Sequence, residues 1–299
     1  MNGRSATLTV LGVAPSGAAA RVAAALGEGG MPPVAACRAG SIAGFAVPGR
    51  AWQNARPALR AALGRAAALS AFLPADPCQA LCDATAWPKV IAGSAGPLGE
   101  ALLREGTAQQ WEIGITPEAD QASAAELAGR LRAALEPHAL AFRLRGRRCG
   151  LVLKVLMPRS SGQVVAEAVA MVAPRLARCL AVEGPLPPLA FAAFRLERAE
   201  METVSRAWAM LALREAADPA EIARRWRGLA FALDPARGGR RLRERPLREA
   251  RQAYGLLRSL SGGLGARRFQ RDELLALCGN TVAVPAVPHA FAERCAIVP

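Results

Sequence analysis

Lysines, histidines and aromatic residues are scarce in this sequence. Lys89 and Lys154 are the only lysines, His138 and His289 are the only histidines, and aromatic side chains make up 5% of the 299 residues. Neither histidine lies beside a motif that could make it a general base, because one follows a helix-ending proline and the other lies in a proline-containing tail. We therefore expect no catalytic residues and no enzymatic activity.

Motifs for metals and nucleotides are also missing. The seven cysteines are odd in number and scattered, which argues against a disulfide framework and favours a reducing cytoplasm. Cys78 and Cys82 have no second pair at metal-binding spacing, so they are better interpreted as buried apolar thiols. No glycine-rich phosphate loop follows a predicted strand. We expect no metal ligands and no cofactor.

Long apolar runs are absent as well. None reaches the ~18 residues that span a bilayer. The opening residues MNGRSATLTV lack the charged start and apolar stretch of a signal peptide. These absences predict a cytoplasmic protein with no membrane partner.

The basic charge is unevenly distributed. The net charge is +14, and it is nearly all arginine. Residues 121–194 carry 10 basic and 4 acidic residues, net +6, and residues 195–273 carry 18 and 11, net +7. An acidic protein surface or nucleic acid could use these regions, although a solvated arginine-rich face explains them equally simply. The arginines are not interleaved with aromatic residues, and the sequence shows neither zinc-finger nor helix-turn-helix spacing. Both observations argue against nucleic-acid binding.

The first part of the chain predicts a mixed α+β domain. Residues 6–13 are typical of a strand, residues 33–49 of a hairpin that turns around 38–41, and residues 51–69 of a helix with its apolar residues on one face. Residues 97–105 predict another short helix. With 52% hydrophobic residues, the chain can hold two or three such domains.

From Trp111 onward the pattern predicts the element order β-α-β-β-α-β. WEIGIT alternates as a strand, Ser123 and Glu126 have capping-box spacing ahead of a helix, and Pro137 ends that helix. LAFRLR and LVLKVLM then predict a hairpin, Ser161 begins a second helix, and CLAVEG and LAFAAFRL complete the strands. This is the ferredoxin-like order, in which two helices cover one face of the sheet.

The stretch GPLPPLAF, residues 184–191, falls inside the last predicted strand. Proline cannot donate to a β-ladder, so the segment must form an edge, a bulge or a bend. One interpretation is a kink that only shapes the fold. The other is a rigid apolar lip that docks another apolar surface.

This stretch resembles gas vesicle proteins of the GvpL/GvpF family, which carry G-P-W-P-P-Y-S-F near the last strand of their second domain. Five of the eight positions match, and Leu186, Leu189 and Ala190 replace the others. The strand WEIGI and the run LVLKVLMPR also resemble the family, and the likeness covers roughly residues 6–196. FLPADP, residues 72–77, keeps only Leu73 and Pro74 of a further family motif.

The resemblance implies a non-catalytic accessory protein made of two α+β domains, the second of them ferredoxin-like. Such a protein would be cytoplasmic, associated with gas vesicles, and would bind the very hydrophobic shell protein GvpA and other gas vesicle accessory proteins. The residues expected to bind a partner are Trp111, Pro185, Leu186, Pro187, Pro188, Leu189 and Phe191.

Residues 206–260 resemble a J-domain. Leu211, Glu221, Ile222, Arg227, Leu229, Ala230, Pro235 and Arg237 match its pattern, and Trp226 stands for its tyrosine. Asp218 is an expected N-cap, Pro219 suits the first helical position, and two antiparallel helices follow. The family's His-Pro-Asp loop is replaced by Asp234, Pro235 and Ala236, which implies a scaffold that does not stimulate an Hsp70. Exposed arginines at 224, 225, 227 and 240–248 could bind an acidic surface or merely be solvated.

We thus expect an N-terminal α+β domain over 1–108, a ferredoxin-like domain over 109–200, a J-domain-like helical module over 201–275 and a tail over 276–299. The tail could pack on the body as an extended strap or stay mobile. The leading hypothesis is an assembly protein that keeps the shell subunit from aggregating. The alternatives are a J-domain co-chaperone with a client-binding N-terminal region and, more weakly, a nucleic-acid-binding ferredoxin-like domain.

Overall fold

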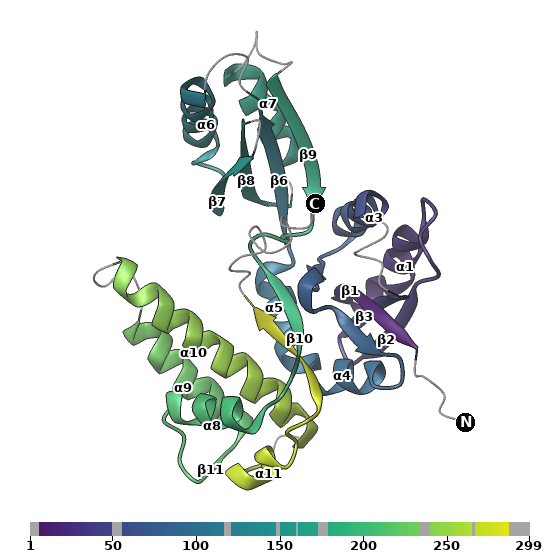
Figure 1. Cartoon of the computed structure of the whole chain (residues 1–299), viewed down its shortest axis with the longest axis vertical. Coiled ribbons are helices and arrows are strands. Elements are labelled where there is room, and N and C mark those ends of the chain that lie inside the picture. Colours follow the sequence, from purple (N-terminus) through teal and green to yellow (C-terminus); the bar gives the residue numbers. More distant parts are fainter. Residues whose placement is uncertain are drawn as a thin grey trace.

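The computed structural model describes residues 6–49, 56–116, 121–147, 150–159, 161–172, 179–233, 240–264 and 267–286. These residues form a mixed structure of helices and antiparallel sheets (Figure 1). The degenerate J-domain loop, Asp234, Pro235 and Ala236, lies outside the described residues, as do His289 and the rest of the tail after Ala286.

The first sheet is built around a strand that is buried on both faces. β1 (Thr7–Pro15) pairs with β3 (Ile42–Pro48) on one side and with the short strands β4 (Leu73–Pro74) and β5 (Leu81–Asp83) on the other, and β2 (Ala35–Ala39) pairs with β3. The predicted hairpin and its turn are therefore present. The sequence of β1 is apolar almost throughout because helices cover both of its faces.

Two helices cover each face of this sheet. α1 (Ala19–Gly27) and α3 (Arg56–Leu69) pack over Leu11, Phe45 and Phe72, whereas α4 (Trp87–Gly93) and α5 (Ala95–Glu105) pack over Val10 and Val13. Short 3-10 turns, η1 (Ser16–Ala18) and η2 (Pro77–Gln79), connect the elements. Cys82 is buried as expected, but Cys78 is exposed because it lies in the η2 turn, so that prediction was wrong for Cys78.

The second sheet has the predicted order of elements. β6 (Ala108–Ile115), α6 (Gln121–Leu135), β7 (Ala141–Arg147), β8 (Gly150–Pro158), α7 (Gly162–Val172) and β9 (Leu180–Leu186) follow one another. The strands lie side by side as β7-β8-β6-β9, all neighbours antiparallel, with α6 and α7 on one face. The expected cap at Ser123 was wrong, because Gln121 and Ala122 already belong to the helix.

The chain then forms a mainly helical part. It contains β10 (Ala193–Arg198), α8 (Met201–Met210), β11 (Ala216–Ala217), α9 (Pro219–Ala232), α10 (Arg240–Ser261), η5 (Gly262–Leu264), β12 (Phe269–Gln270), α11 (Arg271–Leu275) and β13 (Thr281–Ala286). The Asp218 side chain accepts a hydrogen bond from the Glu221 N–H at 2.7 Å, so the predicted N-cap is confirmed. α9 and α10 pack side by side, and the Trp226 and Tyr254 rings stack with centroids 5.5 Å apart.

β10 lies elsewhere than expected. The sequence placed LAFAAFRL among the strands of the second sheet, but β10 pairs with β13 and packs into the core of the first unit, where Phe194 is fully buried. An isolated bridge joins Phe194 to Ala75, just beyond β4. β4 is only two residues long, so the edge of the first sheet beyond Pro74 has no strand of its own. β10 packs at this edge and covers it.

Residues 281–286 of the tail form a strand. Figure 1 shows β13 in yellow beside β10. The Ala283 N–H donates to Ser94 Oγ at 3.0 Å, and Ser259 Oγ donates to the Ala283 carbonyl at 2.8 Å. β13 is thereby held between the start of α5 and the end of α10, which agrees with a strap over 281–286.

Ion pairs join α10 to α5. Tyr254 Oη donates to Glu100 at 2.9 Å, Arg258 pairs with Glu100 at 3.1 Å, and Arg251 pairs with Glu105. Part of the positive charge of the helical region is therefore neutralised within the chain. Arg224, Arg225 and Arg227 of α9 are exposed.

The packing around the first sheet can be tested at Gly12, which lies close to Phe72 and Leu73. A Cβ at Gly12 would lie 2.4 Å from the Phe72 ring and 2.7 Å from the Leu73 carbonyl oxygen. We expect Gly12→Ala to lower the free energy of unfolding by about 2 kcal/mol because neither neighbour can move freely. Urea unfolding measures this. Gly17→Ala is the control, since nothing lies within 4 Å of its added carbon; equal stability of both variants would contradict the packing described.

Candidate partner-binding site at the junction of the two sheets

Residues 184–191, here called the bend, connect the two sheets. Gly184 to Leu186 end β9, and the chain then turns at Pro188, whose carbonyl accepts hydrogen bonds from the N–H groups of Phe191 at 2.8 Å and Ala192 at 2.7 Å. The turn sends the chain away from β9 into β10. The sequence correctly predicted a bend at this position.

Most of the bend is covered by the chain itself. Leu186 is 3% exposed and Leu189 is 6% exposed, and Pro187 and Pro188 are buried. Leu189 packs into the same core as Leu59 of α3. The prediction of an exposed lip was therefore wrong for these four residues, because the apolar side of α3 lies within reach and burial there removes their surface from water.

The remaining predicted partner-binding residues point in different directions. Pro185 is half-buried and borders a groove. Phe191 is half-buried, and the Arg143 guanidinium lies 5.4 Å from its ring centroid. Trp111 belongs to the core under α6 and α7, where it packs so closely on Gly184 that an added Cβ would be 2.5 Å from the ring. Of the predicted partner-binding residues, the structure therefore brings Pro185, Leu186 and Leu189 together with α3, whereas Trp111 and Phe191 lie elsewhere.

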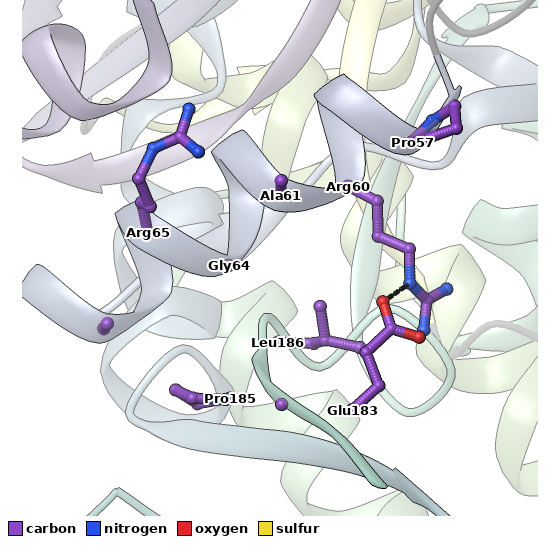
Figure 2. A pocket seen from close by; sticks show the side chains of 10 residues that line it. Pro57, Arg60, Ala61, Gly64, Arg65, Glu183, Pro185 and Leu186 are labelled. Atoms are coloured by element: carbon purple, nitrogen blue, oxygen red, sulfur yellow. Dashed lines mark hydrogen bonds and ion pairs between the residues drawn. The ribbon is translucent and has the colours of Figure 1, made fainter. Parts of the chain in front are cut away.

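An open groove of about 660 Å³ lies between α3 and the end of β9. Its floor and walls are mostly apolar: Pro57, Ala61, Gly64, Ala68, Pro185 and Leu186. Figure 2 shows α3 on one side and the bend on the other, with the Arg60–Glu183 ion pair at one end. Gly64 permits the close approach, since its added Cβ would be 3.1 Å from the Pro185 carbonyl oxygen. We call this feature the α3–β9 groove.

A row of charged residues crosses the second sheet beside the groove. Arg143 of β7 is opposite Lys154 of β8, which is opposite Glu112 of β6, which is opposite Glu183 of β9. Directly paired residues of neighbouring strands share a face, and Glu112 alternates with Trp111 and Ile113, which pack under α6 and α7. All four charged residues therefore lie on the face that α6 and α7 leave uncovered. We call these four residues the charged row. Arg60 of α3 contacts both of its acidic members.

Glu112 is the centre of this network. Its side chain is 5% exposed, and its carboxylate lies 2.9 Å from Lys154 Nζ and 2.6 Å from Arg60 Nη2. Burial by itself raises the pKa of Glu112. The charges of Lys154 and Arg60 and their hydrogen bonds lower that pKa by more than burial raises it, so it lies below the ordinary value. Glu112 is therefore ionised at neutral pH.

Gln110 connects the charged row to the bend. Its side-chain N–H donates to Glu112 at 2.6 Å, and its side-chain oxygen accepts from the Ala190 N–H at 2.7 Å. The neighbouring Gln109 donates to the Ala67 carbonyl of α3 at 3.2 Å. Both amides are buried, so their polar atoms are satisfied only while α3, β6 and the bend are in contact.

Five residues of this network were not predicted from the sequence: Arg60, Gln110, Glu112, Lys154 and Glu183. One signal was available: in WEIGIT, Glu112 lies on the opposite face from Trp111 and Ile113, so it faces the side of the sheet that the helices do not cover. The sequence gives no way to see that Arg60, from a helix more than 50 residues earlier, contacts it.

Chemistry beyond binding is not indicated by the described residues. His138 is exposed. Across the described ranges, no group of three or more His, Cys, Asp and Glu side chains could hold a metal ion, and no described helix is both long and apolar enough to cross a membrane.

Two solved structures are similar to this chain. GvpF from Anabaena sp. PCC7120 is 11% identical with a TM-score of 0.46, and the match covers 62% of this chain and 95% of that protein. GvpF from Microcystis aeruginosa is 10% identical with a TM-score of 0.44, covering 61% and 97%. Both are gas vesicle proteins, as expected from residues 184–191. No family model and no curated protein matches the sequence.

The J-domain resemblance receives no support from these comparisons. Two antiparallel helices and an N-cap at Asp218 are present, but such helical hairpins occur in many folds.

Glu112→Gln tests the ion-pair network. We expect a loss of about 3 kcal/mol in the free energy of unfolding at neutral pH, because Lys154 and Arg60 lose a buried charged partner. The pKa of Glu112 is lowered in the folded state, so its contribution is present above the ordinary glutamate value of 4.5 and is lost as pH falls through the lowered value. Urea unfolding at neutral and successively lower pH should show the two proteins converging in acid.

Glu126→Gln is the matched control, since Glu126 is an exposed residue of α6. This variant should match the wild type within about 0.5 kcal/mol at every pH. A difference between Glu112→Gln and wild type that stays constant on acidification would show that the carboxylate charge is not what stabilises the junction.

Proposed function

We propose that this protein is a gas vesicle accessory protein that binds the hydrophobic shell protein GvpA and keeps it from aggregating while vesicles form. The role is that of a non-enzymatic adaptor or holdase. The protein acts in the cytoplasm at growing gas vesicles, where other gas vesicle accessory proteins are its further partners.

The bend is the observation that carries this proposal. It supplies the sequence resemblance to the GvpL/GvpF family, and with α3 it also forms the α3–β9 groove. A groove lined by alanine, glycine, proline and leucine suits an apolar partner because its occupation removes apolar surface from water on both sides.

The exposed side of β9 adds a second means of holding a partner. β9 is an edge strand of the second sheet, residues 181–184 are exposed, and Val182 is 44% exposed. An extended segment of the shell protein can add to this edge through backbone hydrogen bonds while its side chains enter the groove. Covering an aggregation-prone segment in this way prevents it from pairing with other shell subunits.

The groove can be tested with Ala61→Glu. Ala61 is an exposed residue of α3 that lines the groove, so a carboxylate there puts charge into the apolar site without disturbing the core. In co-expression with the shell protein, we expect the wild type to co-purify with it and the variant to retain at least about tenfold less, since the burial of a charge opposes apolar docking.

Ala166→Glu provides the control, because Ala166 is an exposed residue on α7, away from the groove. Its complex with the shell protein should equal that of the wild type. If Ala61→Glu and Ala166→Glu retain equal amounts, the groove is not the binding site. If the wild type neither co-purifies with the shell protein nor slows its aggregation, the proposed function itself is wrong.

A further inference from the structure

The second sheet has another edge, and its chemistry differs from that of β9. β7 is the outermost strand opposite β9 (Figure 1). It runs for seven residues, and its pairing with β8 continues from Ala141 to Arg147 without a shift in register. Its outer side has no pairing strand among the described residues. The edge therefore offers an ordered row of backbone donors and acceptors.

The two faces of β7 carry different side chains. Phe142 and Leu144 lie on the face with α6, where the Arg132 guanidinium covers the Phe142 ring at 5.5 Å. Leu144 is nevertheless 55% exposed, and Leu140, just before the strand, is 61% exposed. A partner strand at this edge would bring apolar side chains over these two leucines.

The opposite face of β7 is basic. Arg143, Arg145 and Arg147 alternate along it, and Lys154 of the charged row lies beside Arg143. Glu112 lies on the far side of Lys154, toward the acidic end of that row, and it pairs with both Lys154 and Arg60. For Arg145 and Arg147, the described part of the chain provides no carboxylate at ion-pairing distance. These two arginines give the edge a positive charge that a partner can neutralise.

We propose that the β7 edge binds an extended segment of a partner protein in which acidic and apolar residues alternate. The segment adds a strand to the sheet through backbone hydrogen bonds. Its acidic side chains face Arg145 and Arg147, and its apolar side chains cover Leu140 and Leu144, as cross-strand neighbours do in a sheet. This second site is independent of the α3–β9 groove and of whether the shell protein binds there.

Other occupants fit the same edge less well. A second copy of β7 would place arginines against arginines, which is unfavourable for directly paired residues. Nucleic acid would neutralise the arginines but leave the backbone edge and both leucines uncovered. Charged side chains can also simply protect an edge from aggregation, as short strands, bulges and prolines do. β7 has no bulge and no proline, and Leu140 and Leu144 stay exposed beside its arginines, so the arginines leave apolar surface for a partner to cover.

The test measures binding of fluorescent peptides to the full-length protein by anisotropy. One peptide alternates glutamate and valine, a second alternates lysine and valine, and a third has the composition of the first with its glutamates and valines in separate blocks. We expect only the first to bind the wild type. The double variant Arg145→Glu/Arg147→Glu should bind it at least about tenfold more weakly and should gain binding of the lysine peptide.

Arg224→Glu/Arg225→Glu is the control, because it makes the same change of charge at two exposed arginines of α9. It should bind all three peptides as the wild type does, and thermal melts confirm that both double variants fold. Equal binding of the block peptide would overturn the proposal, since charge alone would then explain the affinity. So would binding of a single-stranded oligonucleotide without binding of the alternating peptide. The proposal also fails if the wild type binds no peptide and the variant Arg145→Ser/Arg147→Ser associates with itself. The arginines would then only protect the edge.

Discussion

The junction of the two sheets depends on one buried carboxylate. Glu112 lies on a strand of the second sheet, yet one of its two cationic partners comes from α3 of the first unit, 2.6 Å away. A carboxylate that is 5% exposed is costly without such partners. Separating α3 from the second sheet would therefore leave Lys154 as the only cationic partner of Glu112. It would also break the contact of Gln109 with α3, and displacement of the bend would break the contact of Gln110 with Ala190. The charged row thus helps to hold α3 against β9, together with the packing of Leu189 on α3, and the groove lies between these two elements.

The bend combines two tasks that the sequence presented as alternatives. Its inner residues, Leu186 and Leu189, are anchored in the protein by burial, whereas Pro185 and one side of Leu186 line the groove. Prolines suit both tasks because they limit the conformations of the unfolded chain and hold the carbonyls of the turn in place. A kink that shapes the fold therefore also shapes the α3–β9 groove.

The two edges of the second sheet divide its surface chemistry. β9 borders an apolar groove and carries the acidic end of the charged row, whereas β7 carries the basic end. Because the row runs across all four strands, the sheet has opposite charges at its two edges on one face. The two proposed sites therefore call for partner segments with different patterns of charged and apolar residues.

Features that arise from neighbouring residues could be predicted from the sequence. The alternation in WEIGIT, the turn around 38–41, the cap at Asp218 and the bend at the prolines each follow from local backbone preferences, so they could be predicted without knowing the fold. Features that depend on distant partners became visible only in the folded chain. Those are the burial of Leu189 under α3, the pairing of β10 with β13, and the ion pairs of Glu112. A local pattern shows which face of a strand is apolar, but the identity of what covers that face is set by contacts between residues far apart in the chain.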